Sequence, residues 1–254
     1  MNFERKDFPV SPEQFDAVLF DMDGVLTATA KLHAVAWKKM FDEYLKKHSG
    51  RTGEPFRPFD SGADYVHYVD GKLRSDGVQS FLRSRGIDLP WGDPADPPEG
   101  ETVCALGNRK NKLVGEAIES EGVEVFPGAV ALVKRLRQIP VKTAVVSASR
   151  NCQTLLQAAG IEDLFEVRVD GVVAEEMNLS GKPAPDTFLK AAELLGVSPA
   201  RAVVVEDAIS GVQAGRAGGF GLVIGVDHKG DPDTLIEHGA DIVVTDLGEL
   251  IKER

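Results

Sequence analysis

The sequence has little cysteine, an excess of acidic over basic residues and no long apolar run. Its two cysteines, Cys104 and Cys152, form no CxxC or other metal-binding spacing, and nothing in their number calls for an oxidising compartment. Acidic residues outnumber basic ones by 40 to 29, for a net charge of −11, which argues against nucleic acid or an anionic membrane surface as a partner. No apolar stretch approaches the about 18 residues that span a bilayer, and the N-terminus lacks a signal-peptide pattern. We therefore expect a cytoplasmic protein.

The composition is otherwise that of a folded globular chain. Hydrophobic residues make up 43% and charged residues 27% of the 254 positions, which excludes a disordered protein. At roughly 150 residues per domain, this length suggests one large domain or two unequal ones. No internal repeat is visible.

Short apolar runs predict the strands of a parallel sheet. They are rich in β-branched residues and nearly continuous, which suits strands buried on both faces. Segments of helical periodicity alternate with them, and this alternation is typical of an α/β fold with a doubly wound, Rossmann-like, mostly parallel sheet. The expected strands are 17–20, 141–146, 202–205, 222–224 and 241–244, and the expected helices among them are about 127–136, 151–159, 185–195 and 209–217.

Residues 29–124 do not fit this alternation, because they are far too many for one crossover helix. Their helical patterns are separated by a turn-rich segment and by an acidic, proline-rich one. We expect residues 29–124 to form an all-helical cap domain, inserted into an α/β core made of residues 1–28 and 125–254. The helical patterns lie at about 30–47, 77–85 and 101–121, and the linkers near 28–30 and 122–126.

Paired carboxylates follow two of the predicted strands: Asp21 and Asp23 after the first, Glu206 and Asp207 after the strand at 202–205. Ligands of open α/β sheets bind at that edge. If the two strands are neighbours, each like-charge pair about 4 Å apart costs on the order of 4 kcal/mol at an effective dielectric of 20. A hard divalent cation such as Mg²⁺, which takes oxygen ligands, would relieve this repulsion. Either pair alone is equally well explained as solvated loop acids or helix caps; the presence of both favours the metal site.

Two other segments carry groups suited to an anion. Residues 147–151, Ser-Ala-Ser-Arg-Asn, follow a predicted strand and open a helix, whose free N–H groups can bind an anion, although Ser and Asn are also ordinary N-caps. Lys182 lies in a loop stiffened by proline. A lone surface lysine is usually solvated, but beside four acids and a metal it would offset their charge and orient a phosphate.

Together these residues resemble the four ordered motifs of the haloacid dehalogenase superfamily of phosphotransferases. DMDGVLT at 21–27, Ser147, Lys182 and the Glu206–Asp207 pair occur in the family's order, and the match spans residues 15 to about 226. The segments GKPAPDTF and VVVEDAISGVQAGRAGG are especially close to the β-phosphoglucomutase-like branch.

The resemblance implies a role for each motif. Asp21 would be the nucleophile that forms an aspartyl-phosphate, and Asp23 the general acid and base. Ser147 and Lys182 would bind the oxygens of the transferring phosphoryl group, with Ala148 beside them. The Mg²⁺ ligands would be Asp21, the backbone carbonyl of Asp23, Glu206 and Asp207.

The resemblance extends into the cap. Residues 23–37 match the family's segment that leads into the cap, which implies that His33 lies near Asp23 and helps to align it; otherwise His33 would be a surface or interface histidine. Lys110 would contact the sugar. Arg74, with Ser149, Arg150 and Asn151, would bind the phosphate that is not transferred. Ala28, Lys31 and two Pro/Gly-rich insertions depart from the branch and leave the identity of the sugar more open than the chemistry.

The function implied by the resemblance is a Mg²⁺-dependent phosphotransferase acting on a hexose phosphate. The expected reaction is that of a β-phosphoglucomutase, from β-glucose 1-phosphate to glucose 6-phosphate through an aspartyl-phosphate and a 1,6-bisphosphate, in a closed cap that excludes water. The alternative is a sugar-phosphate phosphatase in which Asp23 activates water. A non-catalytic scaffold would have lost Asp21 or Asp23, and a dehalogenase would not need Asp23 together with the Glu206–Asp207 pair. We expect the chain to act as a monomer.

Overall fold

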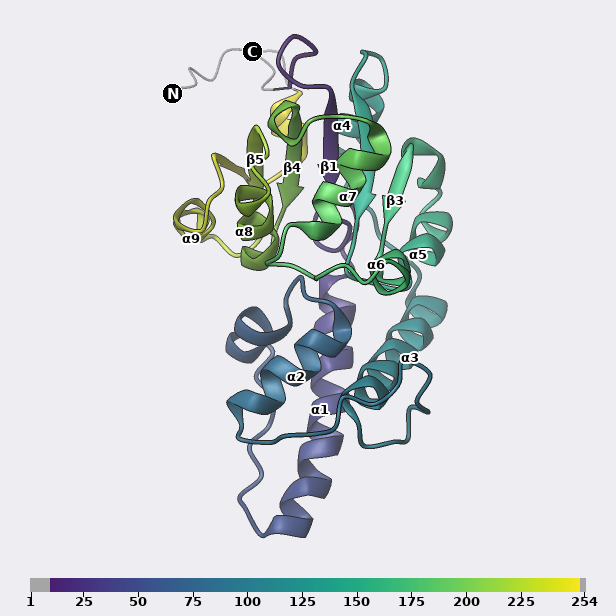
Figure 1. The fold of residues 1–254 in the computed structure, drawn as a ribbon, viewed down its shortest axis with the longest axis vertical. Helices are drawn as coiled ribbons and strands as arrows, with labels where there is room; N and C mark the ends of the chain where they lie inside the picture. The colour runs from purple at the N-terminus through teal and green to yellow at the C-terminus, as the bar shows by residue number, and fades with distance from the viewer. Residues whose placement is uncertain (1–9, 252–254) are drawn as a thin grey trace.

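Six parallel strands form one sheet in residues 10–251, the part of the chain that the structure, a computed structural model, describes. The strand order is β3-β2-β1-β4-β5-β6 (Figure 1). β1 lies between β2 and β4 in parallel register, so the carboxyl ends of these three strands meet at one edge. The doubly wound α/β class is confirmed. The strands are β1 (Ala17–Phe20), β2 (Lys142–Val146), β3 (Val167–Val169), β4 (Ala202–Glu206), β5 (Leu222–Val226) and β6 (Ile242–Val244).

The edge strand β3 was not predicted from the sequence. It is three residues long, and Arg168 at its centre interrupts the apolar run. Strand pairing with β2, rather than its own apolar pattern, defines it. Asp170 directly follows β3, and its carboxylate accepts the backbone N–H groups of Val172 and Val173 at the start of the next helix.

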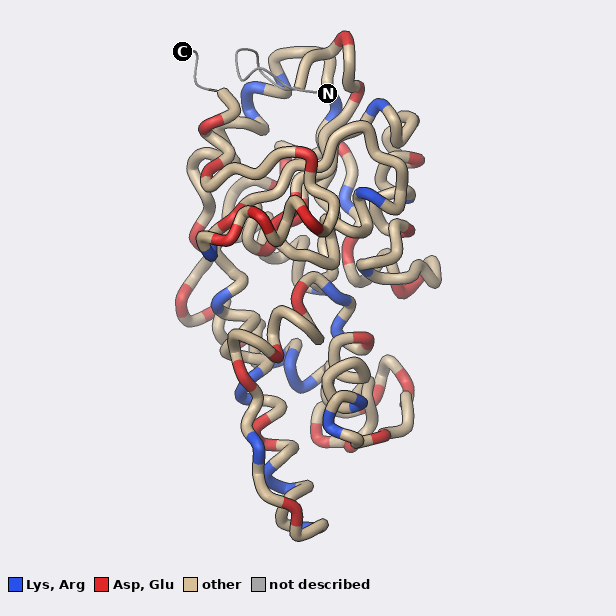
Figure 2. The backbone as a smooth tube through the Cα atoms, turned by 90° about the vertical axis from the view of Figure 1, so that its left-hand side faces the viewer, with Lys and Arg blue, Asp and Glu red and all other residues tan. Residues whose placement is uncertain are grey.

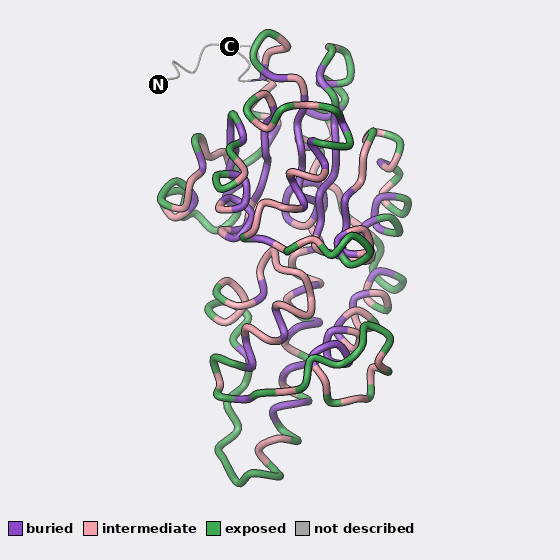
Figure 3. The backbone as a smooth tube through the Cα atoms, viewed as in Figure 1, coloured by how far each residue is buried: buried purple, intermediate pink, exposed green. Residues whose placement is uncertain are grey.

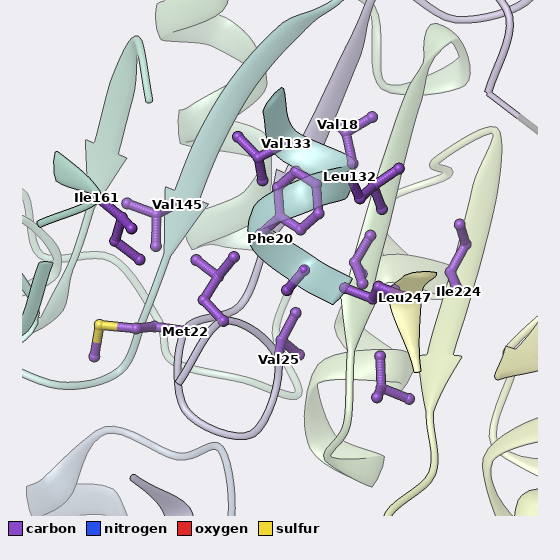
Figure 4. Packing of buried hydrophobic residues seen from close by; sticks show 14 of the residues in the cluster. Val18, Phe20, Met22, Val25, Leu132, Val133, Val145, Ile161, Ile224 and Leu247 are labelled. Atoms are coloured by element: carbon purple, nitrogen blue, oxygen red, sulfur yellow. The ribbon is translucent and has the colours of Figure 1, made fainter. Parts of the chain in front are cut away.

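Helices cover both faces of the sheet. Alternate residues of a strand point to opposite faces, so Phe20 joins a cluster with α4 (Pro127–Leu136) and α5 (Cys152–Ala158), as Figure 4 shows for its contacts with Leu132 and Val133. Leu19 joins the cluster on the other face with α7 (Asp186–Leu195) and α8 (Ile209–Ala217). Figure 3 shows the resulting buried layer along the strands. The remaining elements of this part are α6 (Gly171–Glu176), α9 (Pro232–Glu237) and the 3-10 turns η2 (Glu162–Leu164), η3 (Pro199–Arg201) and η4 (Leu247–Leu250).

Residues 29–124, called the cap segment below, lie beyond the carboxyl edge of the sheet (Figure 1). Many of their buried hydrophobic residues form a cluster of their own, rich in aromatic rings, among them Phe41 and Phe81 with ring centroids 4.2 Å apart. Ala36, Val114 and Ile118 instead join the cluster of the sheet. The stretch after residue 47, predicted to be rich in turns, is partly helical. α1 continues to Thr52, and after a loop a π-helical turn begins at Tyr65. The elements are α1 (Ala30–Thr52), η1 (Tyr65–Val69), α2 (Arg74–Ser84) and α3 (Val103–Glu121).

The chain enters and leaves the cap segment through two paired connections. The Ala28 N–H donates to the Glu124 carbonyl at 2.9 Å, and the Phe126 N–H to the Leu26 carbonyl at 3.0 Å. These bonds lie at the predicted linkers. The division into a cap domain and a core at these positions stays a prediction.

Cys104 and Cys152 are both free and buried. Within residues 10–251, no helix combines the length and apolarity that crossing a bilayer demands.

Candidate active site

The turn after β1 carries Asp21 and Asp23 at the carboxyl edge of the sheet. The Asp21 N–H donates to the Val205 carbonyl of β4 at 2.9 Å, which fixes the start of the turn. Gly24 has a φ of +91°, and a Cβ at this position would lie 2.1 Å from Oδ2 of Asp207. A glycine is therefore needed here both for the backbone conformation and for the approach of the second acidic pair.

Three carboxylates and one lysine meet at this edge. Asp21, Glu206 and Asp207 each place a carboxylate oxygen within 4.8 Å of the others. Lys182 Nζ donates to Asp21 Oδ1 and to Glu206 Oε1, both at 2.5 Å. Glu206 Oε2 accepts the Ala208 N–H at 2.9 Å. Lys182 precedes a cis peptide bond to Pro183, in the loop before α7.

The charges of this cluster are strongly coupled. Burial raises the pKa of Asp21 well above its usual range, with Lys182 acting in the opposite direction. Burial also raises the pKa of Asp207, and the neighbouring carboxylates of Asp70 and Glu206 add to the effect. Burial would lower the pKa of Lys182, but Asp21 and Glu206 outweigh it and raise that pKa. One lysine thus faces more negative charge than it can neutralise.

The carboxylate cluster has the donors that a hard metal ion requires. Its oxygens are those that Mg²⁺ or Ca²⁺ prefers, and its excess negative charge would be balanced by a divalent cation. Hydrogen bonds already engage both oxygens of Glu206, but each carboxylate oxygen has a second lone pair. Asp21, Glu206 and Asp207 can therefore hold a metal ion together.

Asp23 lies beside this cluster, within reach of polar groups from three segments. Thr29 Oγ1 donates to its Oδ1, Ser147 Oγ lies 3.4 Å from its Oδ2, and His33 Nε2 lies 3.5 Å from Oδ1. Thr27 and Thr29 share a further hydrogen bond of 2.7 Å. Asp23 is thus held between the turn after β1, the strand end of β2 and the start of α1.

His33 and Lys110 form a buried pair above Asp23. Lys110 Nζ lies 3.0 Å from His33 Nδ1 and 4.9 Å from the centre of the Trp37 ring. Burial lowers the pKa of His33 to about 4 and that of Lys110 to about 8. His33 is therefore neutral at pH 7, and its buried Nε2 has no hydrogen-bond partner.

Arg74 reaches the same pocket from α2. Its Nη2 donates to Asn108 Oδ1 at 2.8 Å, while its buried Nε is unpaired. Burial and the nearby Arg150 lower its pKa. Basic positions lie among acidic ones where the cap segment meets the sheet (Figure 2). Arg74 from the cap segment and Arg150 from the loop after β2 both line the pocket, and two cationic side chains suit an anionic group.

One pocket has walls from both the sheet and the cap segment. Ser147, Asn151, Lys182 and Glu206 are not among its lining residues. Asn151 instead bonds Asn111, Nδ2 to Oδ1 at 3.1 Å. The lining residues are Asp21, Asp23, His33, Trp37, Tyr65, Val69, Asp70, Gly71, Lys72, Arg74, Lys110, Asn111, Ala148, Ser149, Arg150, Asp207 and Ala208.

Tyr65, Asp70 and Lys72 are pocket residues that sequence reasoning missed. Tyr65 begins the π-helix, and its carbonyl accepts the Asp70 N–H at 3.0 Å. Single π-turns are often found at functional sites, but their i to i+5 hydrogen bonds leave no periodicity that the sequence displays. The acidic and aromatic residues of 60–72 were the only available signal.

Comparisons with known proteins agree with this geometry. Residues 15–219 match a family model described as haloacid dehalogenase-like hydrolase. The chain is 52% identical, over 243 residues, to the β-phosphoglucomutases of Mycobacterium bovis and Mycobacterium tuberculosis, a match that covers 94% of this chain and 93% of theirs. The chain belongs to the haloacid dehalogenase superfamily, in its β-phosphoglucomutase-like subfamily.

More distant members of the superfamily extend the likeness. A β-phosphoglucomutase of Bacillus subtilis is 31% identical over 93% of this chain and 92% of its own. The crystal structure of a β-phosphoglucomutase from Clostridium difficile shares the fold, with a TM-score of 0.72, 24% identity and 93% coverage of each chain. The family resemblance noted in the motifs is thus confirmed, and the chain is an enzyme of the phosphoglucomutase and phosphatase type.

Proposed function

We propose that this enzyme is a β-phosphoglucomutase, which converts β-glucose 1-phosphate into glucose 6-phosphate. The observation that carries the proposal is one pocket lined by Asp21 and Asp207 from the sheet and by His33 and Lys110 from the cap segment, with Lys182 bonded to Asp21 behind it. The identity of 52% with two mycobacterial enzymes of that name supports the same reaction.

In the proposed reaction Asp21 attacks the phosphorus atom and becomes an aspartyl-phosphate. Asp23 protonates the leaving oxygen and later takes the proton of the attacking sugar hydroxyl. Lys182 and the Ser147–Ala148 segment stabilise the negative charge that develops on the phosphoryl oxygens. Lys182 touches Asp21 directly and so holds the nucleophile in place before the phosphate arrives.

We assign the metal as Mg²⁺, held by Asp21, Glu206 and Asp207, with the backbone carbonyl of Asp23 as a further ligand. The ion would supply positive charge that screens the anionic nucleophile from the anionic phosphate. The donor set is all oxygen, which supports a hard cation.

The cap segment would bind the sugar and its second phosphate. Neutral His33, with an unpaired Nε2 facing Asp23, is placed to align that acid for a sugar hydroxyl. Lys110 would contact the sugar. Arg74 and Arg150, with Ser149 and Asn151 nearby, would bind the phosphate that is not transferred. A bisphosphate intermediate needs such a second anion site because it must bind in two orientations.

A sugar-phosphate phosphatase is the second candidate function. The family model itself describes hydrolases, and the same Asp21 and Asp23 would serve if Asp23 activated water. The cap residues decide between the two, because a phosphatase has no need to align a second sugar hydroxyl. A monomeric state and a cytoplasmic location also remain proposals.

A coupled assay distinguishes these candidates. Purified enzyme with Mg²⁺, β-glucose 1-phosphate and a trace of the 1,6-bisphosphate should form glucose 6-phosphate, and the α anomer should not react. Release of inorganic phosphate without glucose 6-phosphate would reject the mutase and favour the phosphatase.

Substitution of Asp21→Asn tests the nucleophile. The amide cannot attack phosphorus, so acid-labile phosphate on the protein should disappear while the far-ultraviolet circular dichroism spectrum stays that of the parent. Ser11→Ala, outside the pocket, is the control and should keep its phosphoenzyme. Acid-labile phosphate persisting on the Asp21→Asn variant would show that the nucleophile is misassigned.

A further inference from the structure

Residues 88–101, called the proline-rich segment below, join α2 to α3 without a helix or strand of their own. The first N–H groups of a helix have no partner within it, and this segment supplies partners for α3. The Val103 N–H donates to the Pro90 carbonyl at 2.9 Å. The Cys104 N–H donates to the Trp91 carbonyl, also at 2.9 Å. The segment is therefore bound to the start of α3.

Two side chains of α3 bind the middle of the proline-rich segment. Asn108 Nδ2 donates to the Pro94 carbonyl at 2.9 Å and to the Asp96 carbonyl at 2.7 Å. Arg109 Nε donates to the Pro98 carbonyl at 2.6 Å. The two carbonyls that face Asn108 fix the orientation of its amide group.

The oxygen of the same amide holds Arg74. Arg74 Nη2 donates to Asn108 Oδ1 at 2.8 Å. Carbonyl oxygens only accept hydrogen bonds and a guanidinium only donates them, so one side chain that serves both must be a donor and an acceptor, as an amide is. A Cβ on Gly107 would lie 3.2 Å from Arg74 Cγ, so the stem of the arginine lies directly on the backbone of α3.

This amide holds Arg74 without neutralising its charge. Among the described residues, Asn108 is the only hydrogen-bond partner of the Arg74 side chain, and the buried Nε has none. Arg150, by contrast, is paired with the carboxylate of Glu175. Arg74 lines the pocket and Asn108 does not. The charge of Arg74 is therefore available to an anion in the pocket, and Asn108 can act on that anion only through Arg74.

We infer that Asn108 is a positioning residue that holds Arg74 for the phosphate that is not transferred, and that the proline-rich segment fixes Asn108 in the orientation this requires. This inference rests on the proposed function. A side chain that is already held in place loses less conformational entropy when the phosphate binds. A fixed Arg74 thus favours substrates that carry an anionic group remote from Asp21. The proline-rich segment influences the choice of substrate without touching it.

Asn108→Ala and Arg74→Ala, alone and together in the full chain, test this role. Asn108→Ala should raise KM for β-glucose 1-phosphate about tenfold and change kcat by less than about threefold, because a hydrogen bond to a charged group that binds substrate is lost. Arg74→Ala should raise that KM about a hundredfold. In the double variant KM should match that of Arg74→Ala within about twofold, because Asn108 then has nothing to position. A general structural loss would instead add to the effect of Arg74→Ala.

A second substrate and three further variants sharpen the test. Hydrolysis of p-nitrophenyl phosphate, which has no second phosphate, should change by less than about twofold in Asn108→Ala. Asn108→Asp can accept from Arg74 but neutralises it and cannot donate to the two carbonyls, so KM for β-glucose 1-phosphate should rise at least about tenfold. Arg109→Met frees the Pro98 carbonyl and should raise that KM about threefold. Ser120→Ala removes an exposed hydroxyl at the other end of α3 and should keep the parent's KM.

An unchanged KM in Asn108→Ala, or equal losses on both substrates, would overturn the positioning role. So would a double variant whose KM far exceeds that of Arg74→Ala. An unchanged KM in Arg109→Met would reject the part given to the proline-rich segment. If Asn108→Ala does not fold, Asn108→Asp decides, and an unchanged KM there rejects the role.

The parent enzyme tests the proposed function separately. If it forms no glucose 6-phosphate, that function fails, and Asn108 is then judged by the hydrolysis of a hexose 1,6-bisphosphate. A KM that Asn108→Ala raises more for the bisphosphate than for p-nitrophenyl phosphate would support the positioning role. Equal changes on the two substrates would reject it.

Discussion

His33 and Lys110 share one hydrogen bond in the pocket, and burial decides how much charge the pair carries. With its pKa lowered to about 4, His33 stays neutral across the neutral range, so its ring can accept and donate hydrogen bonds without adding charge beside Asp23. Lys110, with its pKa lowered to about 8, is the charged partner below that pH. The pair therefore carries one positive charge, not two.

The buried histidine predicts a specific pH dependence of stability. Its pKa is lowered from 6.5 to about 4, so between these values the unfolded chain binds the proton and the folded chain does not. The free energy of unfolding should therefore fall as the pH drops from 6.5 to 4, by up to roughly 3 kcal/mol from this group. The free energy of unfolding, measured with urea in the presence of EDTA, should depend less steeply on pH between 4 and 6.5 in His33→Asn than in the parent.

The exposed His67 supplies the control for that measurement, since His67→Asn should keep the parent's dependence of unfolding free energy on pH. Other groups titrate in the same window, so the difference between variants carries the prediction rather than the slope itself. Parallel curves for the parent and His33→Asn would contradict it.

The residues that the sequence could locate are those tied to strand ends. Asp21 and Asp207 follow continuous apolar strands, and neighbouring parallel strands must bring their carboxyl ends together. Tyr65 and Asp70 were not predicted as site residues because they belong to a π-turn, which leaves no periodic signal in the sequence. Their position in the pocket depends on how the cap segment packs against the sheet. No local sequence pattern encodes that packing.

At the scale of elements, α8 is shaped to fit the carboxylate of Glu206. Gly211, inside the helix, stands where a Cβ would be 1.7 Å from Glu206 Oε1. Lys182 and the Ala208 N–H hold that carboxylate from its other sides, so it cannot swing away. The glycine-rich helix therefore permits a fully buried acid at the end of β4.

This packing predicts opposite effects for two helical glycines. Alanine normally stabilises a helix interior by up to about 1 kcal/mol over glycine, and Gly115→Ala in α3, where nothing lies within 4 Å, should show that gain. Gly211→Ala should instead lose about 1–3 kcal/mol of unfolding free energy, because the new methyl group displaces Glu206. Denaturant unfolding of both variants checks this, and a stabilised Gly211→Ala would refute it.

Elements with a strong apolar pattern were predicted within a few residues, and weak ones were not. β4 and α8 follow from their sequences alone. β3, η1, α6 and α9 are three to six residues long, and tertiary contacts rather than their own periodicity define them. The extension of α1 to Thr52 was missed because glycine and serine suggested a turn.

For the molecule as a whole, the proposed metal site at the acidic cluster would couple metal binding to folding stability. An ion that binds only the folded chain at about a hundred times its Kd adds about 2.7 kcal/mol. For a chain of this length, that corresponds to a rise of roughly 5–10 °C in Tm. Mg²⁺ added after EDTA treatment should produce such a rise, and Asp207→Asn should lose most of it.

A surface acid tests whether the rise is specific to that cluster. Asp233→Asn, exposed on α9, removes the same charge far from the ligands and should keep the full rise. The assignment of the metal site would fail if Mg²⁺ raised Tm equally in Asp207→Asn and in the parent.

The paired connections at Ala28–Glu124 and Leu26–Phe126 have a consequence for how such enzymes diversify. Because the two ends of the inserted segment leave the sheet side by side, its length adds little to the entropic cost of closing the loop. We therefore expect that residues 29–124 can change in length or be exchanged as a unit without displacing the strands that carry Asp21 and Asp207. The same paired connections would accept the corresponding segment of a relative with a different sugar preference. Asp21 and Asp207 would keep their places at the ends of their strands.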